Sequence, residues 1–132
     1  MNNEMTSGLK ITFLLHSLIS GLVGFQHLFF PRIWTGLAGM EITETVTWRL
    51  IGAALLAFSV SSWMAFKEDN LNRVRIIILM EMVWSFLGAG IILWGISAEG
   101  LPEMEWVNVI LLLLFGILFT LYYVRSRKSA GS

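Results

Sequence analysis

Four long apolar runs, separated by short polar stretches, limit what this chain can fold into. A helix needs about 20 apolar residues to cross the roughly 30 Å hydrocarbon core of a bilayer. The runs predict membrane spans at about 11–30, 48–66, 76–96 and 102–124. Apolar residues make up 56% of the chain and charged residues only 14%, whereas soluble domains carry about 25% charged residues. The sequence therefore predicts an all-α integral membrane protein with one transmembrane domain over residues 1–132.

Composition and motifs exclude several functions. The chain has no cysteine, which excludes disulfides, iron–sulfur clusters, thiolate zinc sites and the small four-helix enzymes that pass electrons from thiols to quinones. The net charge is zero and no basic patch is interleaved with aromatic residues, so we expect no nucleic-acid partner. No spacing typical of a metal site, a catalytic nucleophile or a phosphate loop occurs. We therefore predict no metal, no cofactor and no catalytic residue, and we favour a non-enzymatic role.

Basic residues lie mainly at one side of the predicted spans. Two fall on the opposite side, Arg32 and Arg49, and seven fall on the main side: Lys10, Lys67, Arg73, Arg75, Arg125, Arg127 and Lys128. Because Lys and Arg accumulate on the cytoplasmic side of membrane proteins, we predict an antiparallel four-helix bundle with both termini in the cytoplasm. Its location is then the plasma membrane, or the inner membrane of a bacterium. Residues 125–132 form a short basic cytoplasmic tail.

The stretches between the spans carry further signals. Pro31 is followed by apolar residues at helical spacing, including Ile33, Trp34 and Leu37, which predicts a short interfacial helix between the first two spans. The polar stretch after the second span is very short, so we expect the second and third spans to form a tight antiparallel hairpin. Small residues are dense in the first three spans and allow close helix approach. We therefore expect these three spans to be in closest contact.

We expect the polar side chains within the spans to form two layers, an inner one and an outer one. Equal depth in the membrane predicts the members of the inner layer. His16 lies five residues into the first span, and Glu81 lies five residues into the third span, which enters from the same side. Both are thus about 7–8 Å deep at 1.5 Å per residue. Ser62 and Thr120 reach the same depth from the other two spans, and we expect a hydrogen bond or ion pair between His16 and Glu81. Such pairs bind protons or ligands, and they also fix helix register; both alternatives stay open.

The outer layer gathers Gln26, His27, Arg49 and Asn108, with Glu105 nearby. The two histidines, eleven residues apart, project from one face of the first span, one in each leaflet. One chain therefore cannot place two imidazoles on the two sides of a haem. Polar residues at headgroup level cost little, and Arg49 also fits an interfacial anchor, so a structural role is the alternative to a binding role.

Two segments resemble the DoxX-like class of small four-helix membrane proteins. They are residues 24–31, Gly-Phe-Gln-His-Leu-Phe-Phe-Pro, and residues 48–56, Trp-Arg-Leu-Ile-Gly-Ala-Ala-Leu-Leu. Chain length and the number of spans match this class over nearly the whole chain. Among single residues the resemblance extends to Pro31, Arg49 and Gly52, and it implies structural roles for them. It implies a subunit of a membrane quinone-linked oxidoreductase or a partner of redox-protective enzymes. Small multidrug transporters, which carry their carboxylate in the first span, and fluoride channels, which insert in both orientations, match in size only.

Three functions stay open at this point. We rank first a non-enzymatic accessory or assembly subunit of a membrane complex with a redox or quinone link. The alternative is a homo-oligomeric small transporter or channel that uses the His16 and Glu81 pair. The third is a membrane enzyme that binds a lipid or quinone in a pocket near His27 and Arg49. The expected partners are the lipid bilayer and either another protein or further copies of the chain.

Overall fold

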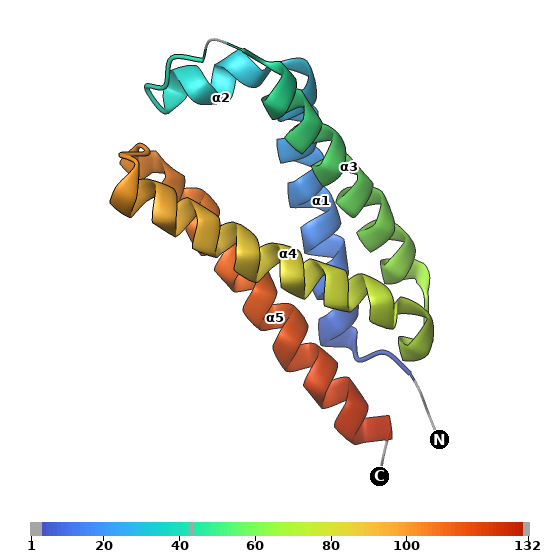
Figure 1. Cartoon of the computed structure of the whole chain (residues 1–132). Helices are drawn as coiled ribbons and strands as arrows, with labels where there is room; N and C mark the ends of the chain where they lie inside the picture. Colours follow the sequence, from blue (N-terminus) through green and yellow to red (C-terminus); the bar gives the residue numbers. More distant parts are fainter. Residues whose placement is uncertain (1–3, 43, 131–132) are drawn as a thin grey trace.

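The computed structural model describes residues 4–42 and 44–130, with side chains up to residue 128 (Figure 1). Its elements in chain order are α1 (Ser7–Phe29), α2 (Pro31–Leu37), α3 (Val46–Lys67), α4 (Leu71–Ala98), the 3-10 turn η1 (Glu103–Glu105) and α5 (Trp106–Ala130). Three helices, α1, α3 and α4, and the η1–α5 segment are each long and apolar enough to cross a membrane. The protein thus has the four membrane-length helices expected of a multi-pass membrane protein.

Helices α1 and α4 begin at capping residues, several positions before the predicted spans do. The Thr6 side chain accepts a hydrogen bond from the backbone N–H of Leu9, and Asn70 caps α4 in the same manner through Asn72. At the other end of the chain, α5 continues to Ala130. Residues 125–130 are therefore the last turns of a helix and not a separate tail, and residues 131–132 lie outside the described part of the chain.

The predicted interfacial helix is present as α2, with Pro31 in its first turn, where the missing N–H costs nothing. Two of its side chains, Pro31 and Thr35, are buried, so one face of this short helix packs inward. The helix ends just before Gly39, which has a φ of 71°. Glycine adopts this left-handed conformation without strain, and the chain can therefore turn towards α3.

The α3–α4 connector has three residues, Glu68–Asn70, and is tied to the start of α1. The Glu68 carboxylate accepts hydrogen bonds from the backbone N–H groups of Asn70 and Asp69 and from the Arg73 side chain. These bonds, above all the one from Asn70, lower the pKa of Glu68. Asp69 accepts a backbone hydrogen bond from Met5 through its carbonyl, and its carboxylate pairs with Lys10. The connector and the N-terminal segment are thus held together.

The long helices pair as α1 with α3 and as α4 with α5, and the two pairs diverge (Figure 1). They meet at the end where Thr6 and Ser126 lie 3.1 Å apart through their hydroxyl oxygens, which we call the terminal end. Towards the opposite end, which carries α2, the pairs separate. The expected tight hairpin of the second and third spans is therefore wrong, as is the expected close packing of the first three spans. Few backbone positions of α3 and α4 lie close together, and beyond the connector the two helices meet through side chains, such as Ser62 with Glu81 and Phe58 with Trp84.

Small residues explain why α1 packs closely against α3. A Cβ atom on Gly52 would lie 2.7 Å from the carbonyl oxygen of Gly24, so the two backbones touch directly. One level nearer the terminal end, Ser17 and Ser59 each donate a hydroxyl hydrogen bond to the other's backbone carbonyl, at 2.9 and 2.7 Å. Close approach and polar bridges of this kind hold helices together in lipid, where apolar surfaces alone do not.

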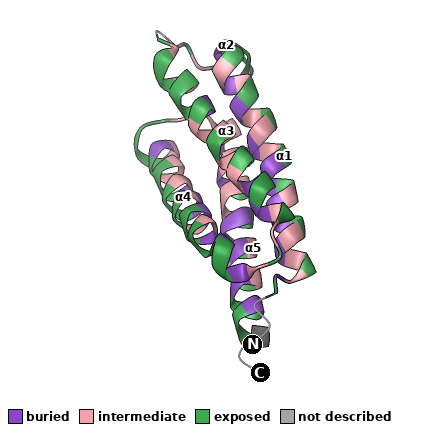
Figure 2. Ribbon diagram, turned by 90° about the vertical axis from the view of Figure 1, so that its right-hand side faces the viewer, coloured by how far each residue is buried: buried purple, intermediate pink, exposed green. Residues whose placement is uncertain are grey.

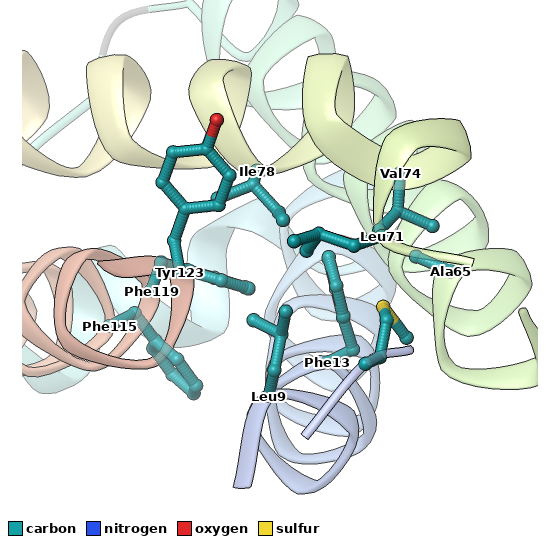
Figure 3. Packing of buried hydrophobic residues seen from close by; sticks show 10 residues of the cluster. Leu9, Phe13, Ala65, Leu71, Val74, Ile78, Phe115, Phe119 and Tyr123 are labelled. Atoms are coloured by element: carbon teal, nitrogen blue, oxygen red, sulfur yellow. The ribbon is translucent and has the colours of Figure 1, made fainter. Parts of the chain in front are cut away.

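An apolar cluster joins all four long helices at the terminal end (Figure 3). The rings of Phe13 on α1 and Phe119 on α5 are 5.0 Å apart at its centre, and both side chains are fully buried. The other members are Met5, Leu9, Ala65, Leu71, Val74, Ile78, Phe115 and Tyr123. Exposed positions cover much of α3 and α4, whereas α1 carries a stripe of buried ones (Figure 2). The cluster therefore closes one end of the molecule.

The close α1–α3 contact gives a stability prediction. We expect Gly52→Ala to lower the thermal midpoint, because the new methyl group would overlap backbone atoms of Gly24 and Leu28 that cannot move away as a side chain can. Overpacking of this kind costs about 1–3 kcal/mol. The measurement is thermal unfolding of the purified protein in a neutral detergent.

Gly90→Ala is the matched control, because nothing lies within 4 Å of a Cβ atom built on Gly90. This variant should unfold at the wild-type temperature or above it, since alanine favours a helix over glycine by about 1 kcal/mol. Equal effects of the two substitutions would contradict the backbone contact between α1 and α3.

Candidate functional site

A cavity of about 370 Å³ lies between the two helix pairs, on the α2 side of the apolar cluster. Its walls are mainly apolar, and their members include Val23, Ile51, Leu55, Ile92, Leu111 and Leu112. Polar side chains lie at its two ends: His16 and Ser20 at the inner end, and His27, Glu105 and Asn108 at the mouth. The volume is within the about 300–1,000 Å³ range of small-molecule sites. The cavity therefore combines an apolar interior with two polar poles.

The inner pole is a group of three side chains from three helices. His16 on α1 places its Nδ1 2.9 Å from the Ser62 hydroxyl on α3, and that hydroxyl donates to Glu81 Oε1 on α4 at 2.9 Å. The second imidazole nitrogen, Nε2, lies 3.3 Å from Glu81 Oε2. The structure thus brings together His16, Ser62 and Glu81, three of the four residues of the predicted inner layer, and we call this group the polar ring.

Counting hydrogens shows which protonation the polar ring needs. Ser62 has one hydroxyl hydrogen and gives it to Glu81, so the hydrogen between Ser62 and His16 must come from Nδ1. With a neutral imidazole and an ionised carboxyl group, Nε2 and Oε2 would then face each other as two acceptors. One further proton, on either Nε2 or Oε2, fills the third contact and brings the net charge of the ring to zero. A buried polar group is stable in this neutral, fully paired state.

Glu81 Oε2 still lacks a hydrogen bond of good geometry, since 3.3 Å is longer than a charge-assisted bond of about 2.7–2.9 Å. One helical turn further along α4, the hydroxyl of Ser85 is also buried without a partner. Both side chains are fully buried. Two buried polar atoms without a hydrogen-bond partner, Glu81 Oε2 and the Ser85 hydroxyl, therefore follow each other on α4 beside the polar ring.

The imidazole of His16 separates the cavity from the apolar cluster. Its ring packs edge-on against Phe115 and Phe119 of α5, with centroid distances of 4.8 and 5.6 Å. These two rings belong to the cluster that closes the terminal end. His16 therefore has apolar packing on its terminal side and the cavity on its other side.

The mouth is organised around Glu105, which is 5% exposed. Its Oε1 accepts a hydrogen bond from the indole N–H of Trp34 on α2 at 3.2 Å, and its Oε2 accepts one from the Asn108 amide at 2.7 Å. His27 donates through Nδ1 to the backbone carbonyl of Val23 at 2.9 Å, which leaves Nε2 as an acceptor. The His27 ring lies 5.5 Å from the Trp48 ring and 6.2 Å from that of Trp34.

Three predicted site residues lie elsewhere. Arg49 is exposed and donates to the backbone carbonyl of Leu28 at 3.0 Å, and Gln26 donates to that of Phe30 at 2.8 Å, so both satisfy carbonyl groups at the end of α1. Thr120 donates to the carbonyl of Gly116 in its own helix at 2.7 Å. The side chains of all three residues thus bond to backbone groups, and none of the three lines the cavity.

Sequence reasoning missed Ser85, named Glu105 only as a neighbour of the outer layer, and placed Trp34 only in the interfacial helix. A signal for Ser85 was present, because it lies four residues after Glu81 and therefore on the same helix face. Glu105 and Asn108 are three residues apart, which also places them side by side on a helix. In residues 4–42 and 44–130, no group of three or more His, Cys, Asp or Glu side chains could hold a metal ion.

Removing the central hydroxyl tests the polar ring. Ser62→Ala should lower the thermal midpoint strongly, because His16 Nδ1 and Glu81 Oε1 would both lose their partner inside the protein. Each buried group without a partner costs about 1–3 kcal/mol. The neighbouring Ser61→Ala removes only a bond to the carbonyl of Phe58 in the same helix and should change stability by less than about 0.5 kcal/mol. Thermal unfolding in detergent compares the two, and equal midpoints would show that the ring does not stabilise the fold.

Comparison with known proteins adds no relative to this description. No family model matches the chain, and neither the curated proteins nor the solved structures contain a match. The assignment to the DoxX-like class therefore stays a prediction from residues 24–31 and 48–56.

Proposed function

We propose that this protein binds a membrane-resident amphiphile in the cavity between its two helix pairs. The carrying observation is the cavity itself, an apolar space of about 370 Å³ with a polar group at each end. An apolar chain would lie along the walls formed by residues such as Leu55, Ile92 and Leu111, and a polar head would lie at the mouth beside His27 and Glu105. Lipids and quinones both have this build, an apolar chain with a polar head.

This proposal modifies the pocket that the sequence suggested. That pocket used His27 together with Arg49 as a polar contact for the ligand. His27 lines the cavity, but Arg49 is exposed and bonded to the end of α1. The proposed binding therefore uses no arginine, and it includes no chemical step.

Binding of an amphiphile fits the accessory or assembly subunit that the sequence favours, since a subunit of a quinone-linked complex needs a place for a membrane-soluble molecule. We further propose that the terminal end lies in the cytoplasm. Support comes from the basic residues, because Lys10, Arg73 and Arg125 all lie at that end, as expected from the positive-inside rule. The accessory function itself stays a prediction from sequence.

Filling the cavity tests the proposed binding. The substitution Leu111→Phe adds volume to a cavity wall, whereas Leu114→Phe makes the same change on the outer face of α5, where Leu114 is 48% exposed. We expect the wild type to carry a stoichiometric amphiphile after purification from native membranes. Leu111→Phe should reduce that amount at least about ten-fold, the effect of roughly 1.4 kcal/mol of lost binding. Solvent extraction and mass spectrometry measure it.

The Leu114→Phe variant should retain the wild-type amount, since its added ring would face lipid. Equal loss in both variants would point to a general change in detergent extraction. Equal retention in both, or no bound molecule in the wild type, would contradict the proposal.

A second candidate function, proton-linked transport, is favoured by one observation. His16 belongs to the polar ring and also lines the cavity, so a ligand could contact a group that holds an exchangeable proton. Glu81→Gln should fold normally, because an amide can donate to Nε2 of His16 and accept from Ser62. It should abolish a pH-dependent flux in proteoliposomes, since the amide cannot release a proton. Exposed Glu99 provides the control, Glu99→Gln, and a flux unchanged by Glu81→Gln would refute this function.

A further inference from the structure

The mouth of the cavity contains a buried carboxylate without a cation. Glu105 is only 5% exposed. Its two carboxylate oxygens accept hydrogen bonds from Trp34 and Asn108, which are both neutral donors. Within residues 4–42 and 44–128, the ion pairs join Lys10 to Asp69, His16 to Glu81 and Arg73 to Glu68, and none involves Glu105. A buried charge normally has a partner of opposite charge, because its desolvation is costly.

The groups around Glu105 offer acceptors and aromatic faces to a ligand. The Trp34 indole N–H and one of the two N–H groups of the Asn108 amide are used on Glu105, and the Nδ1 hydrogen of His27 is used on Val23. His27 therefore contributes a lone pair on Nε2. Trp48 adds an indole ring 5.5 Å from the imidazole, and both residues line the cavity. The carboxylate, the lone pair and the indole face give this mouth a negative or electron-rich surface.

Such surroundings select the charge of the ligand headgroup. An anionic head would face a carboxylate and a lone pair, and a neutral head would leave the charge of Glu105 without a counter-ion. An ammonium group, in contrast, pairs with a carboxylate and is attracted to the faces of aromatic rings, with tryptophan the strongest. A carboxylate beside an indole ring in a water-poor site is a typical binding place for an alkylated ammonium ion.

We propose that the amphiphile of this cavity carries an alkylated ammonium headgroup, which lies between Glu105 and Trp48. Its apolar chain extends along the cavity walls towards His16. This inference rests on the proposed function, since it names the headgroup of the molecule that the cavity binds. It requires Glu105 as the counter-ion, and it predicts discrimination between heads on the same chain.

A titration with three probes of equal chain length tests the headgroup. The probes are decyltrimethylammonium, decanol and decyl sulfate, added to the purified wild-type protein in a neutral maltoside detergent and measured by isothermal titration calorimetry. Decyltrimethylammonium should bind at least about ten-fold more tightly than decanol, and decyl sulfate should bind most weakly. Binding of the cation should also weaken as salt is added, because part of the attraction is electrostatic.

Two variants locate the effect at one carboxylate. Glu105→Gln should remove the preference for the cation, so that decyltrimethylammonium and decanol bind with similar affinity. Its amide can keep both neighbours paired, because the Asn108 amide can rotate to accept a hydrogen bond. Glu103→Gln removes the same charge from an exposed residue of the same 3-10 turn and should retain the full preference. A thermal midpoint for each variant confirms that both remain folded.

The outcomes separate this inference from the proposed function. Equal binding of decanol and the cation, or a preference that survives Glu105→Gln, would overturn the ammonium headgroup while leaving amphiphile binding in place. Binding of none of the three probes, together with no loss of copurifying amphiphile in Leu111→Phe, would overturn the proposed function itself. Tighter binding of decyl sulfate would also overturn the inference.

The ammonium group could belong to a free alkylammonium ion or to a choline lipid. Competition distinguishes these sources, with dihexanoylphosphatidylcholine added against bound decyltrimethylammonium. Displacement would assign the site to a choline headgroup, and its absence would assign the site to a free cation, because the phosphate of the lipid would then be rejected at the mouth. Both results retain the carboxylate as the counter-ion.

Discussion

Three helices of this protein are joined at one point by the contacts among His16, Ser62 and Glu81. Lipid chains are as apolar as the helix surfaces, so burial of apolar side chains does little to bring the helices together. The α1–α3 pair has its own close contact through Gly24 and Gly52. For α4, the polar ring and the adjacent apolar cluster are the main contacts with that pair. The ring therefore decides where the second helix pair stands relative to the first, and hence where the cavity lies.

Two buried carboxyl groups lie at opposite ends of the cavity region and differ in what surrounds them. Glu81 has a histidine and a serine as partners, and one shared proton makes that group neutral. Glu105 has two neutral donors, so its hydrogen bonds need no proton on the carboxyl group. The inner pole can thus be neutral with partners from the protein alone. The charge of Glu105 at the mouth is balanced only when a positively charged group binds there. This difference is the reason for assigning a structural role to the inner pole and a binding role to the mouth.

Depth along a span was predictable from sequence, whereas rotation about the helix axis was not. Counting residues from the span ends placed His16, Ser62 and Glu81 at one level, and the structure brings them into contact. The same count placed Thr120 there, but its hydroxyl is bonded within its own helix. A level specifies distance along the membrane normal only. A contact also needs the side chain to face the right neighbour, and that depends on which helices pair.

Helix pairing was the part that composition could not predict. Small residues occur in each of the first three spans, so their number does not say whether Gly24 approaches α3 or α4. The deciding feature is a match between two particular backbones, Gly24 against Gly52, at equal depth on facing surfaces. The short α3–α4 connector suggested the opposite pairing. A short connector brings the helix ends together but sets no angle between the axes, and here the two backbones diverge beyond it (Figure 1).

The size of side chains across the two pairs explains why the cavity does not close. Within the pairs, glycines lie at the contacts, such as Gly52 between α1 and α3 and Gly116 between α4 and α5. Across the pairs, large residues line the cavity, among them Trp48 near the start of α3 and Trp84 near the middle of α4. Bulky rings do not allow the close backbone approach that glycines allow, so the backbones of the two pairs stay further apart here. An apolar space at this depth in a membrane would be filled by hydrocarbon chains whatever their origin. Any selectivity must then come from the head and not from the chain, which gives Glu105 the greatest influence over what this protein holds.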